Sequence, residues 1–310
     1  MKKIMMIFLM GGVLISPPAL RAADYFSMLQ STVPSVRRDA VNKIGSERNP
    51  EWIDRLGGIL RGDGNFTVRA AAAEALGNIR SRAAAPHLIA GLKDKERNVK
   101  ASVLVSMGYI RSSETVDPLI KFAKAEKDEG LKVSALNVLG VIGDPAALGI
   151  LHDSLSSSST PRVRQIAAQS LGRLRNEESV KALVGVIGDK DKNLRLQAAR
   201  ALGEIGSSEA LKPLSRQLGR ESDTEVLVAL AHALGQLGNQ DGLDIVLNAT
   251  RSDNNSLKRS ALRALGAIGA QTPAVESAIL EAMRNENPAV QRDAEIAASF
   301  LNIDLPFSAE

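Results

Sequence analysis

Residues 194–206 read Leu-Arg-Leu-Gln-Ala-Ala-Arg-Ala-Leu-Gly-Glu-Ile-Gly, and this stretch holds the pattern that decides the fold. Its apolar residues Leu194, Ala198, Ala201, Leu202 and Ile205 stand at the first position and 4, 7, 8 and 11 residues later. This spacing places them on one face of an α-helix, because a helix turns once in about 3.6 residues. The stretch therefore predicts an amphipathic helix that ends at its second glycine.

The same pattern recurs along nearly the whole chain, which is characteristic of a repeat protein. Successive copies begin 31 to 33 residues apart, at Val36, Val68, Val99, Leu131, Val163, Leu194, Val226, Leu257 and Val290. We number positions within a copy from this first residue, so that position +4 lies four residues after it. A second apolar stripe at +17, +20 and +24, as in Val180, Leu183 and Ile187, predicts a second helix. The copies predict an all-α fold of about eight and a half two-helix units.

Glycine and proline mark the ends of these helices. A capping side chain precedes a proline at Asp144-Pro145, Thr160-Pro161, Thr272-Pro273 and Asn287-Pro288, which predicts helix starts. Position +12 is glycine in several copies, which favours a left-handed residue that ends the first helix. In other copies position +12 is arginine, which we expect to interact with the helix carbonyl end through its charge rather than to adopt that conformation; these are Arg48, Arg80, Arg111 and Arg175.

Position +9 is glycine in all eight complete copies. A glycine inside a helix costs up to about 1 kcal/mol relative to alanine. We therefore predict that a neighbouring helix approaches too closely there for a Cβ atom. The glycines are Gly45, Gly77, Gly108, Gly140, Gly172, Gly203, Gly235 and Gly266.

The frame Val-Arg-x-x-Ala-x-x-Ala-Leu-Gly-x-Ile-Gly resembles the short HEAT-like repeat, the type named for phycobilisome lyase subunits. Leu194–Gly206, Leu131–Gly143 and Leu257–Gly269 are its clearest copies, and the resemblance covers about residues 30–303. It implies a right-handed α-solenoid whose second helices line the concave side, with one continuous thin core along its length. Because this repeat also occurs in many proteins that are not lyases, we do not infer bilin lyase activity from it.

The N-terminal stretch has the layout of a secretory signal. Lys2 and Lys3 precede an apolar run from Ile4 to Ile15, and small residues follow at Ala22-Ala23. A run of about 12 residues is short for a membrane anchor, which needs about 20. We therefore predict a signal peptide over residues 1–22, a single repeat domain over 23–310 without a membrane span, and a periplasmic or secreted location.

The composition narrows the possible functions. The chain has no cysteine, which excludes disulfides, thiolate metal sites and a cysteine nucleophile. Its net charge of +4 falls to +1 without residues 1–22, which hold three bases and no acid. A nearly neutral mature chain gives little support to a nucleic-acid partner.

Basic residues occupy position +1 in most copies, and acids precede many copies. The bases are Arg37, Arg69, Lys100, Lys132, Arg164, Arg195 and Lys258, and the acids are Asp63, Asp94, Glu96, Asp128, Asp189, Asp191, Asp223 and Asp253. Leu227 and Gln291 interrupt the basic series. We predict that bases and acids pair into a ladder along the repeats; the alternative is a free basic stripe that binds an anionic polymer.

The sequence contains no pattern typical of catalysis or metal binding. The three histidines are too far apart for a helical metal pair, which needs ligands three or four residues apart. The deoxyhypusine hydroxylases, similar in repeat type, bind iron through His-Glu dipeptides, but other residues follow His87, His152 and His232 here. We therefore predict no catalytic residue, no cofactor, no metal and no enzymatic activity.

The exposed positions of the second helices, +18 and +22, predict where a partner binds. They lack aromatic side chains, which argues against single-stranded nucleic acid. Their one basic cluster, Lys181, Lys212 and Arg216, spans two adjacent copies and predicts a protein-binding site for an acidic segment. We predict a non-catalytic scaffold or adaptor that binds another protein in the cell envelope. Alternatives are an accessory subunit of a lyase-type or other modifying enzyme, and a binder of anionic polymer.

Overall fold

The computed structural model describes residues 22–156 and 159–303. The stretch for which we predict a signal peptide lies outside these residues, except for Ala22. Helix α1 (Ala22–Leu29) precedes the repeats. The first helices of the repeats are α2 (Pro34–Glu47), α4 (Phe66–Ile79), α6 (Arg97–Ile110), α8 (Glu129–Ile142), α10 (Pro161–Leu174), α12 (Lys192–Ile205), α14 (Thr224–Gln236), α16 (Asn255–Ile268) and α18 (Pro288–Leu301).

The second helices are shorter than the first helices. They are α3 (Ile53–Gly62), α5 (Ala85–Gly91), α7 (Val116–Ala125), α9 (Leu148–Leu155), α11 (Val180–Val184), α13 (Leu211–Leu218), α15 (Leu243–Ala249) and α17 (Pro273–Met283). A three-residue 3₁₀ turn precedes each second helix from α3 to α13. The described residues contain no strand, so the predicted all-α solenoid is confirmed.

Polar side chains start these helices where the sequence predicts. The Asp144 carboxylate accepts a hydrogen bond from the Ala146 amide at 2.9 Å, at the start of the turn before α9. Thr160, Thr272 and Asn287 accept amide hydrogen bonds at the starts of α10, α17 and α18. Each cap satisfies a backbone N–H that has no partner within its own helix.

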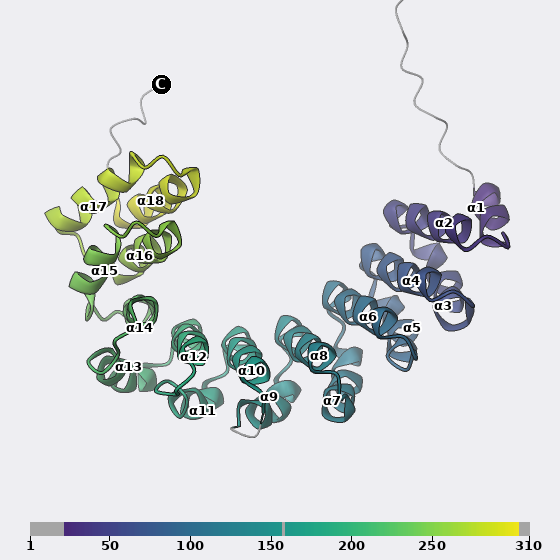
Figure 1. The fold of residues 1–310 in the computed structure, drawn as a ribbon, viewed down its shortest axis with the longest axis horizontal. Coiled ribbons are helices and arrows are strands. Elements are labelled where there is room, and N and C mark those ends of the chain that lie inside the picture. The colour runs from purple at the N-terminus through teal and green to yellow at the C-terminus, as the bar shows by residue number, and fades with distance from the viewer. Residues whose placement is uncertain (1–21, 157–158, 304–310) are drawn as a thin grey trace, which may run out of the picture.

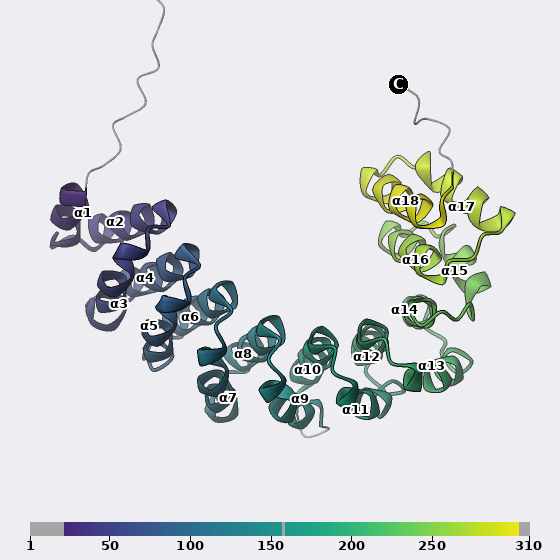
Figure 2. The same ribbon diagram turned by 180° about the vertical axis from the view of Figure 1, so that it is seen from behind.

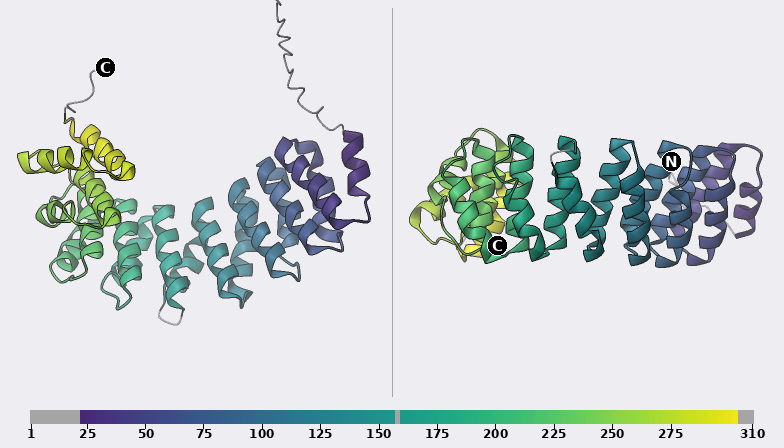
Figure 3. Two further views of the ribbon diagram at one scale, coloured as in Figure 1. Left: turned by 45° about the horizontal axis from the view of Figure 1, so that its top comes forward. Right: turned by 90° about the horizontal axis from the view of Figure 1, so that it is seen from below.

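The repeats stack into an arc with two rows of helices (Figure 1). The long first helices form the inner, concave row and the short second helices form the outer, convex row, as the reverse view also shows (Figure 2). Two further views show the same curved array (Figure 3). The expectation that second helices line the concave side is therefore wrong.

Small residues explain why the first helices form the inner row. A Cβ atom at Gly45 would lie 2.8 Å from the Cα atom of Ala75 in the next repeat. Such close contacts bring successive first helices together, while the second helices spread apart on the convex side. The prediction of close approach at +9 is confirmed at most copies, but not at Gly108 and Gly266, where the nearest atoms would lie 3.7 and 3.5 Å away.

The arginines at position +12 do adopt the left-handed conformation. Arg48, Arg80, Arg111 and Arg175 have φ angles between 45° and 56°. Our expectation that arginine would avoid this conformation is wrong, because the chain must reverse at this point to reach the second helix. A left-handed residue other than glycine costs roughly 1–2 kcal/mol, so packing of the two helices outweighs this strain.

The hydrophobic core is divided in two. One cluster of buried side chains extends from Tyr25 to Leu234, and a second extends from Val228 to Leu301. The two clusters meet at α14, which contributes Leu234 to the first and Val228 to the second. The expected single continuous core is therefore corrected to two clusters, with Leu218 packed against both.

Candidate functional site on the inner face

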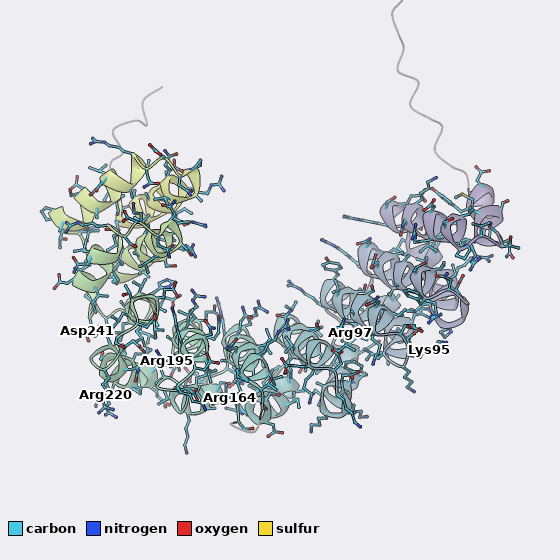
Figure 4. The ribbon with its side chains drawn as sticks, viewed as in Figure 1. Lys95, Arg97, Arg164, Arg195, Arg220 and Asp241 are labelled. Atoms are coloured by element: carbon cyan, nitrogen blue, oxygen red, sulfur yellow. The ribbon has the colours of Figure 1, made fainter. Side chains whose placement is uncertain are left out.

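Five bases at position +1 form the predicted ladder with acids that precede the next repeat. The pairs are Arg37–Asp63, Arg69–Asp94, Lys100–Glu126, Arg164–Asp189 and Arg195–Glu221, with N···O distances of 2.7 to 2.8 Å. Arg164 and Arg195, labelled in Figure 4, come from the neighbouring helices α10 and α12. Glu126 and Glu221 were not among the predicted acids.

Each of these ion pairs, which we call the rungs of the ladder, also holds the loop between two repeats in place. The Glu221 carboxylate accepts hydrogen bonds from the Asp223 amide at 3.0 Å and from the Arg195 guanidinium at 2.8 and 3.0 Å. Burial opposes ionisation of Glu221, yet these hydrogen bonds lower its pKa to about 2. Arg195 also donates to the Asp189 carbonyl oxygen, which joins one rung to the next. The ladder is therefore structural, and its paired bases leave little free charge for an anionic polymer.

The predicted binding cluster lies on the outer row. Lys181 belongs to α11, and Lys212 and Arg216 belong to α13. All three are exposed, and none of their side chains makes a hydrogen bond or ion pair within the described residues. Because these helices are on the convex side, the cluster is not on the concave surface where we expected it. Its role in binding a partner stays a prediction.

The inner face is the surface formed by positions +6 and +10 of the first helices, which are exposed in most repeats and belong to the inner, concave row (Figure 1). The opposite side of each first helix packs mainly against the second helix of the preceding repeat, as α4 does against α3 and α8 against α7. Val105 and Tyr109 of α6, one turn apart, are each about half exposed, at 50% and 51%. At the same positions Arg200, His232 and Arg263 follow one another in α12, α14 and α16.

A pocket of about 270 Å³ opens on the inner face over α12, α14 and α16. No second helix contributes to it. Its lining residues are Arg200, Glu204, Glu225, Val228, Ala229, His232, Gln236, Ser260 and Arg263. Most of them carry polar or charged groups, so the pocket favours a polar ligand.

Two guanidinium groups act on the imidazole of this pocket. His232 is partly buried, and its burial, with the positive charges of Arg263 and Arg200, lowers the pKa of the imidazole. Desolvation, together with repulsion from Arg263, lowers the pKa of Arg200, while Glu204 and Glu225 oppose this effect. His232 is therefore neutral at neutral pH, between two cations.

The two arginines differ in their partners. Arg200 makes no hydrogen bond or ion pair within residues 22–156 and 159–303. Arg263 lies 3.4 Å from the Asp293 carboxylate, which Arg259 approaches more closely, at 2.7 Å. Glu225 on the pocket wall is paired with Lys192 at 2.7 Å. The pocket therefore presents the Arg200 guanidinium, which makes no side-chain ion pair within the described residues, and the weakly paired Arg263, beside the carboxylates of Glu204 and Glu225. Guanidinium groups of this kind suit a carboxylate ligand.

Sequence reasoning missed this pocket because it examined the exposed positions of the second helices. The signal lay at position +6 of the first helices, where Arg200, His232 and Arg263 occupy three successive repeats. The other histidines lie elsewhere: His87 contacts Asp54 and Arg61, and His152 contacts Ser179. No group of three acidic or histidine side chains in the described part of the chain is placed to hold a metal ion.

The repeats define the class of the protein. The model of HEAT repeats matches residues 24–104, 85–172, 150–227 and 216–299, so the chain belongs to the HEAT repeat family. It is 29% identical over 151 residues to the bilin biosynthesis protein PecF of Nostoc sp. strain PCC 7120, which covers 44% of this chain and 85% of that protein.

Two further similarities are to proteins that are named for lyases. The chain is 27% identical over 225 residues to phycocyanobilin lyase subunit alpha of the same organism, covering 66% of this chain and 81% of that subunit. It also resembles the solved complex of CpcE and CpcF of phycocyanin lyase from Nostoc sp. PCC7120, with 23% identity, a TM-score of 0.45, and coverage of 86% of this chain and 98% of the other.

These relatives correct two predictions. The prediction of no enzymatic role is contradicted, because the relatives include a subunit named for a phycocyanobilin lyase. The predicted periplasmic or secreted location is contradicted as well, because the relatives are described as bilin biosynthesis and lyase proteins. None of the described helices combines the length and apolar character that crossing a membrane requires.

Proposed function

We propose that this chain is an accessory subunit of a lyase-type or other modifying enzyme, and that its inner face holds a partner protein. The observation that carries the proposal is the exposed pair Val105 and Tyr109 on the inner face of α6. Half-exposed large apolar side chains on adjacent turns are typical of contact surfaces, because they gain from burial against a partner. The lyase subunit among the relatives supports the enzymatic context.

The inner face also suits an extended partner. The repeats use positions 0, +4, +7 and +8 for packing, so the exposed +6 and +10 positions are free to vary from one repeat to the next. They are apolar in α6 and include Arg173, Arg200 and Arg263 in α10, α12 and α16. A partner with an apolar segment near an acidic segment complements this order.

The function is tested by removing the chain from its own cells. The proteins that copurify with the tagged chain are identified, and their intact masses are compared between strains with and without it. An accessory subunit of a modifying enzyme predicts that one partner loses a covalent group when the chain is absent. Unchanged masses for all stable partners would contradict the enzymatic context.

The contact surface is tested with matched variants. Replacing Val105 and Tyr109 with Asp is expected to weaken the complex at least tenfold, because burying a carboxylate against apolar groups is costly. Replacing Lys212 and Arg216 with Asp tests the rival surface on the outer row that the sequence predicts; if the inner face holds the partner, this variant binds it as the unchanged chain does. If only the outer variant loses the partner, the inner face is the wrong surface.

A further inference from the structure

We propose that the pocket at Arg200, His232 and Arg263 binds a carboxylate side chain of the partner protein. This inference rests on the proposed function, since the pocket opens on the same inner face as Val105 and Tyr109. It adds the chemical group that is recognised and the residues that recognise it.

The arginines carry this inference. They extend from α12 and α16, on either side of His232 in α14, and both line one pocket. Arg200 has no hydrogen-bond or ion-pair partner within the described residues, and the contact of Arg263 with Asp293 is long, at 3.4 Å. A guanidinium offers planar paired N–H donors that fit the two oxygens of a carboxylate. A carboxylate between them would also relieve the repulsion of the two cations.

The acidic residues of the pocket limit the size of the anion. Glu204 and Glu225 line the same space, and Glu225 is fixed by Lys192 at 2.7 Å. A long polyanion would meet these carboxylates, whereas a single carboxylate can remain between the guanidinium groups. Gln236 and Ser260 provide further neutral hydrogen-bond donors along the wall.

The position of the pocket favours a protein-borne carboxylate over a free small molecule. The pocket is open to the concave surface, and few apolar groups line it, whereas pockets for small molecules are predominantly apolar. An Asp or Glu side chain needs no apolar enclosure, because the rest of its chain is held along the surface.

The test uses defined carboxylate probes and histidine NMR. The probes are the acidic peptide acetyl-Gly-Glu-Gly amide, which carries one carboxylate, its uncharged analogue acetyl-Gly-Gln-Gly amide, and succinate. The chain has three histidines, so the ring signals of His232 can be assigned by comparison with His232→Gln. We expect the acidic peptide to shift these signals saturably and to raise the pKa of His232, because a nearby negative charge favours the imidazolium. The uncharged peptide should have no effect.

Matched variants decide between specific and general charge effects. Arg200→Gln is expected to weaken binding of the acidic peptide at least tenfold, while Arg220→Gln, at an exposed arginine just after α13, should leave it unchanged. Circular dichroism of both variants checks that the fold is intact. No saturable shift, or equal losses in the two variants, would overturn the site, and a response to succinate alone would overturn the protein-borne source.

The outcome is separable from that of the proposed function. If the peptide fails to bind while Val105 and Tyr109 remain necessary for the partner complex, the carboxylate site is wrong and the proposed function stands. If the peptide binds as expected but no partner is modified, the site stands as an acidic-segment receptor and the enzymatic context is wrong.

Discussion

The repeats from α2 to α13 and those from α14 to α18 are built from one sequence pattern, yet their neighbours are joined differently. In the first region, ion pairs such as Arg195–Glu221 join the loops of successive repeats. In the second region Leu227 takes the place of the base, and Arg284 stands where an acid would pair with Lys258. The hydrophobic core divides at α14, where the ladder stops.

The ends of the first helices follow this division only in part. Arginine ends the first helix in α2, α4, α6 and α10, all in the first region, whereas glycine ends α8 and α12 in that region and α16 in the second. We infer that the ladder sets the spacing of the first region and tolerates strained helix ends there. The second region lacks rungs between its loops within the described residues; apolar packing and the Arg259–Asp293 ion pair between α16 and α18, at 2.7 Å, join its repeats instead.

The largest effect is expected from breaking a rung. Arg195→Leu leaves the Glu221 side chain, which is only 4% exposed, without its counter-charge. Breaking a buried ion pair costs about 3–5 kcal/mol of unfolding free energy. Urea denaturation measures this loss. Lys258→Leu is the matched change in the second region and should cost far less, because Lys258 has no ion pair within the described residues; equal losses would remove the distinction between the regions.

Acid should weaken the first region through the same rung. The pKa of Glu221 is about 2 in the folded chain and 4.5 in its ordinary state, so the folded state favours the ionised form. This stability is present above pH 4.5 and is lost as the pH falls toward 2, to a total of about 3 kcal/mol. The dependence of the urea midpoint on pH should be weaker in Glu221→Gln. An unchanged slope in urea midpoints between pH 5 and pH 2 would contradict this role.

The glycines at +9 offer a smaller test of close packing. A Cβ atom at Gly172 would lie 2.8 Å from the Cα atom of Ala201, so Gly172→Ala should destabilise the chain by about 1–3 kcal/mol. At Gly266 the nearest atom would lie 3.5 Å away, and Gly266→Ala should be neutral or gain up to about 1 kcal/mol from helix propensity. Opposite signs in thermal denaturation are the expected result. A loss at both sites would mean that the neighbouring helix leaves no room for a Cβ atom at Gly266 either.

Exchanging arginine and glycine at the ends of the first helices should change the free energy of unfolding in opposite directions, by about 1 kcal/mol each. Arg80 has a φ angle of 56°, so Arg80→Gly removes the strain of a left-handed residue with a side chain and should stabilise the protein. Gly206, at 78°, is the reciprocal site, and Gly206→Arg should destabilise it. Melting temperatures of the two variants measure these two opposite effects. A stabilised Gly206→Arg variant would show that arginine has a favourable contact at this position.

The sequence predicted the features that repeat. The period of the apolar residues placed the helices, and glycine at +9 indicated the contact between first helices, as Gly45 and Ala75 illustrate. The bases at +1 predicted a ladder because acids precede many of the copies, and five of the seven bases form such pairs within the described residues. A repeated feature is visible without coordinates, since every copy is evidence for the same contact.

The features that the sequence did not predict depend on curvature. Nothing in the apolar pattern states which row of helices is concave, so Lys181, Lys212 and Arg216 were assigned to the wrong side. The pocket at His232 is formed by three helices that curve toward a common space, and its residues occupy positions that the repeat leaves free. The division of the core at α14 was missed because Val228 and Leu234 are both ordinary apolar residues of one helix.

The smallest effect is expected from restoring a rung in the second region. Asp253 lies 26 residues after Leu227, the same separation as between Arg195 and Glu221. Leu227→Arg therefore places a guanidinium where it can pair with Asp253, and its aliphatic part can retain some contact of the half-buried leucine. Because Asp253 is exposed, we expect a gain of only about 0.5 kcal/mol.

Hydrogen exchange gives the sharper measurement, since a new rung should slow amide exchange in α14 and α16 more than in α4. Leu227→Gln is the control, as it loses the same apolar contact without adding charge. If both variants exchange equally fast, Asp253 does not form a rung, and the second region differs from the first in the path of its loop as well as in its side chains.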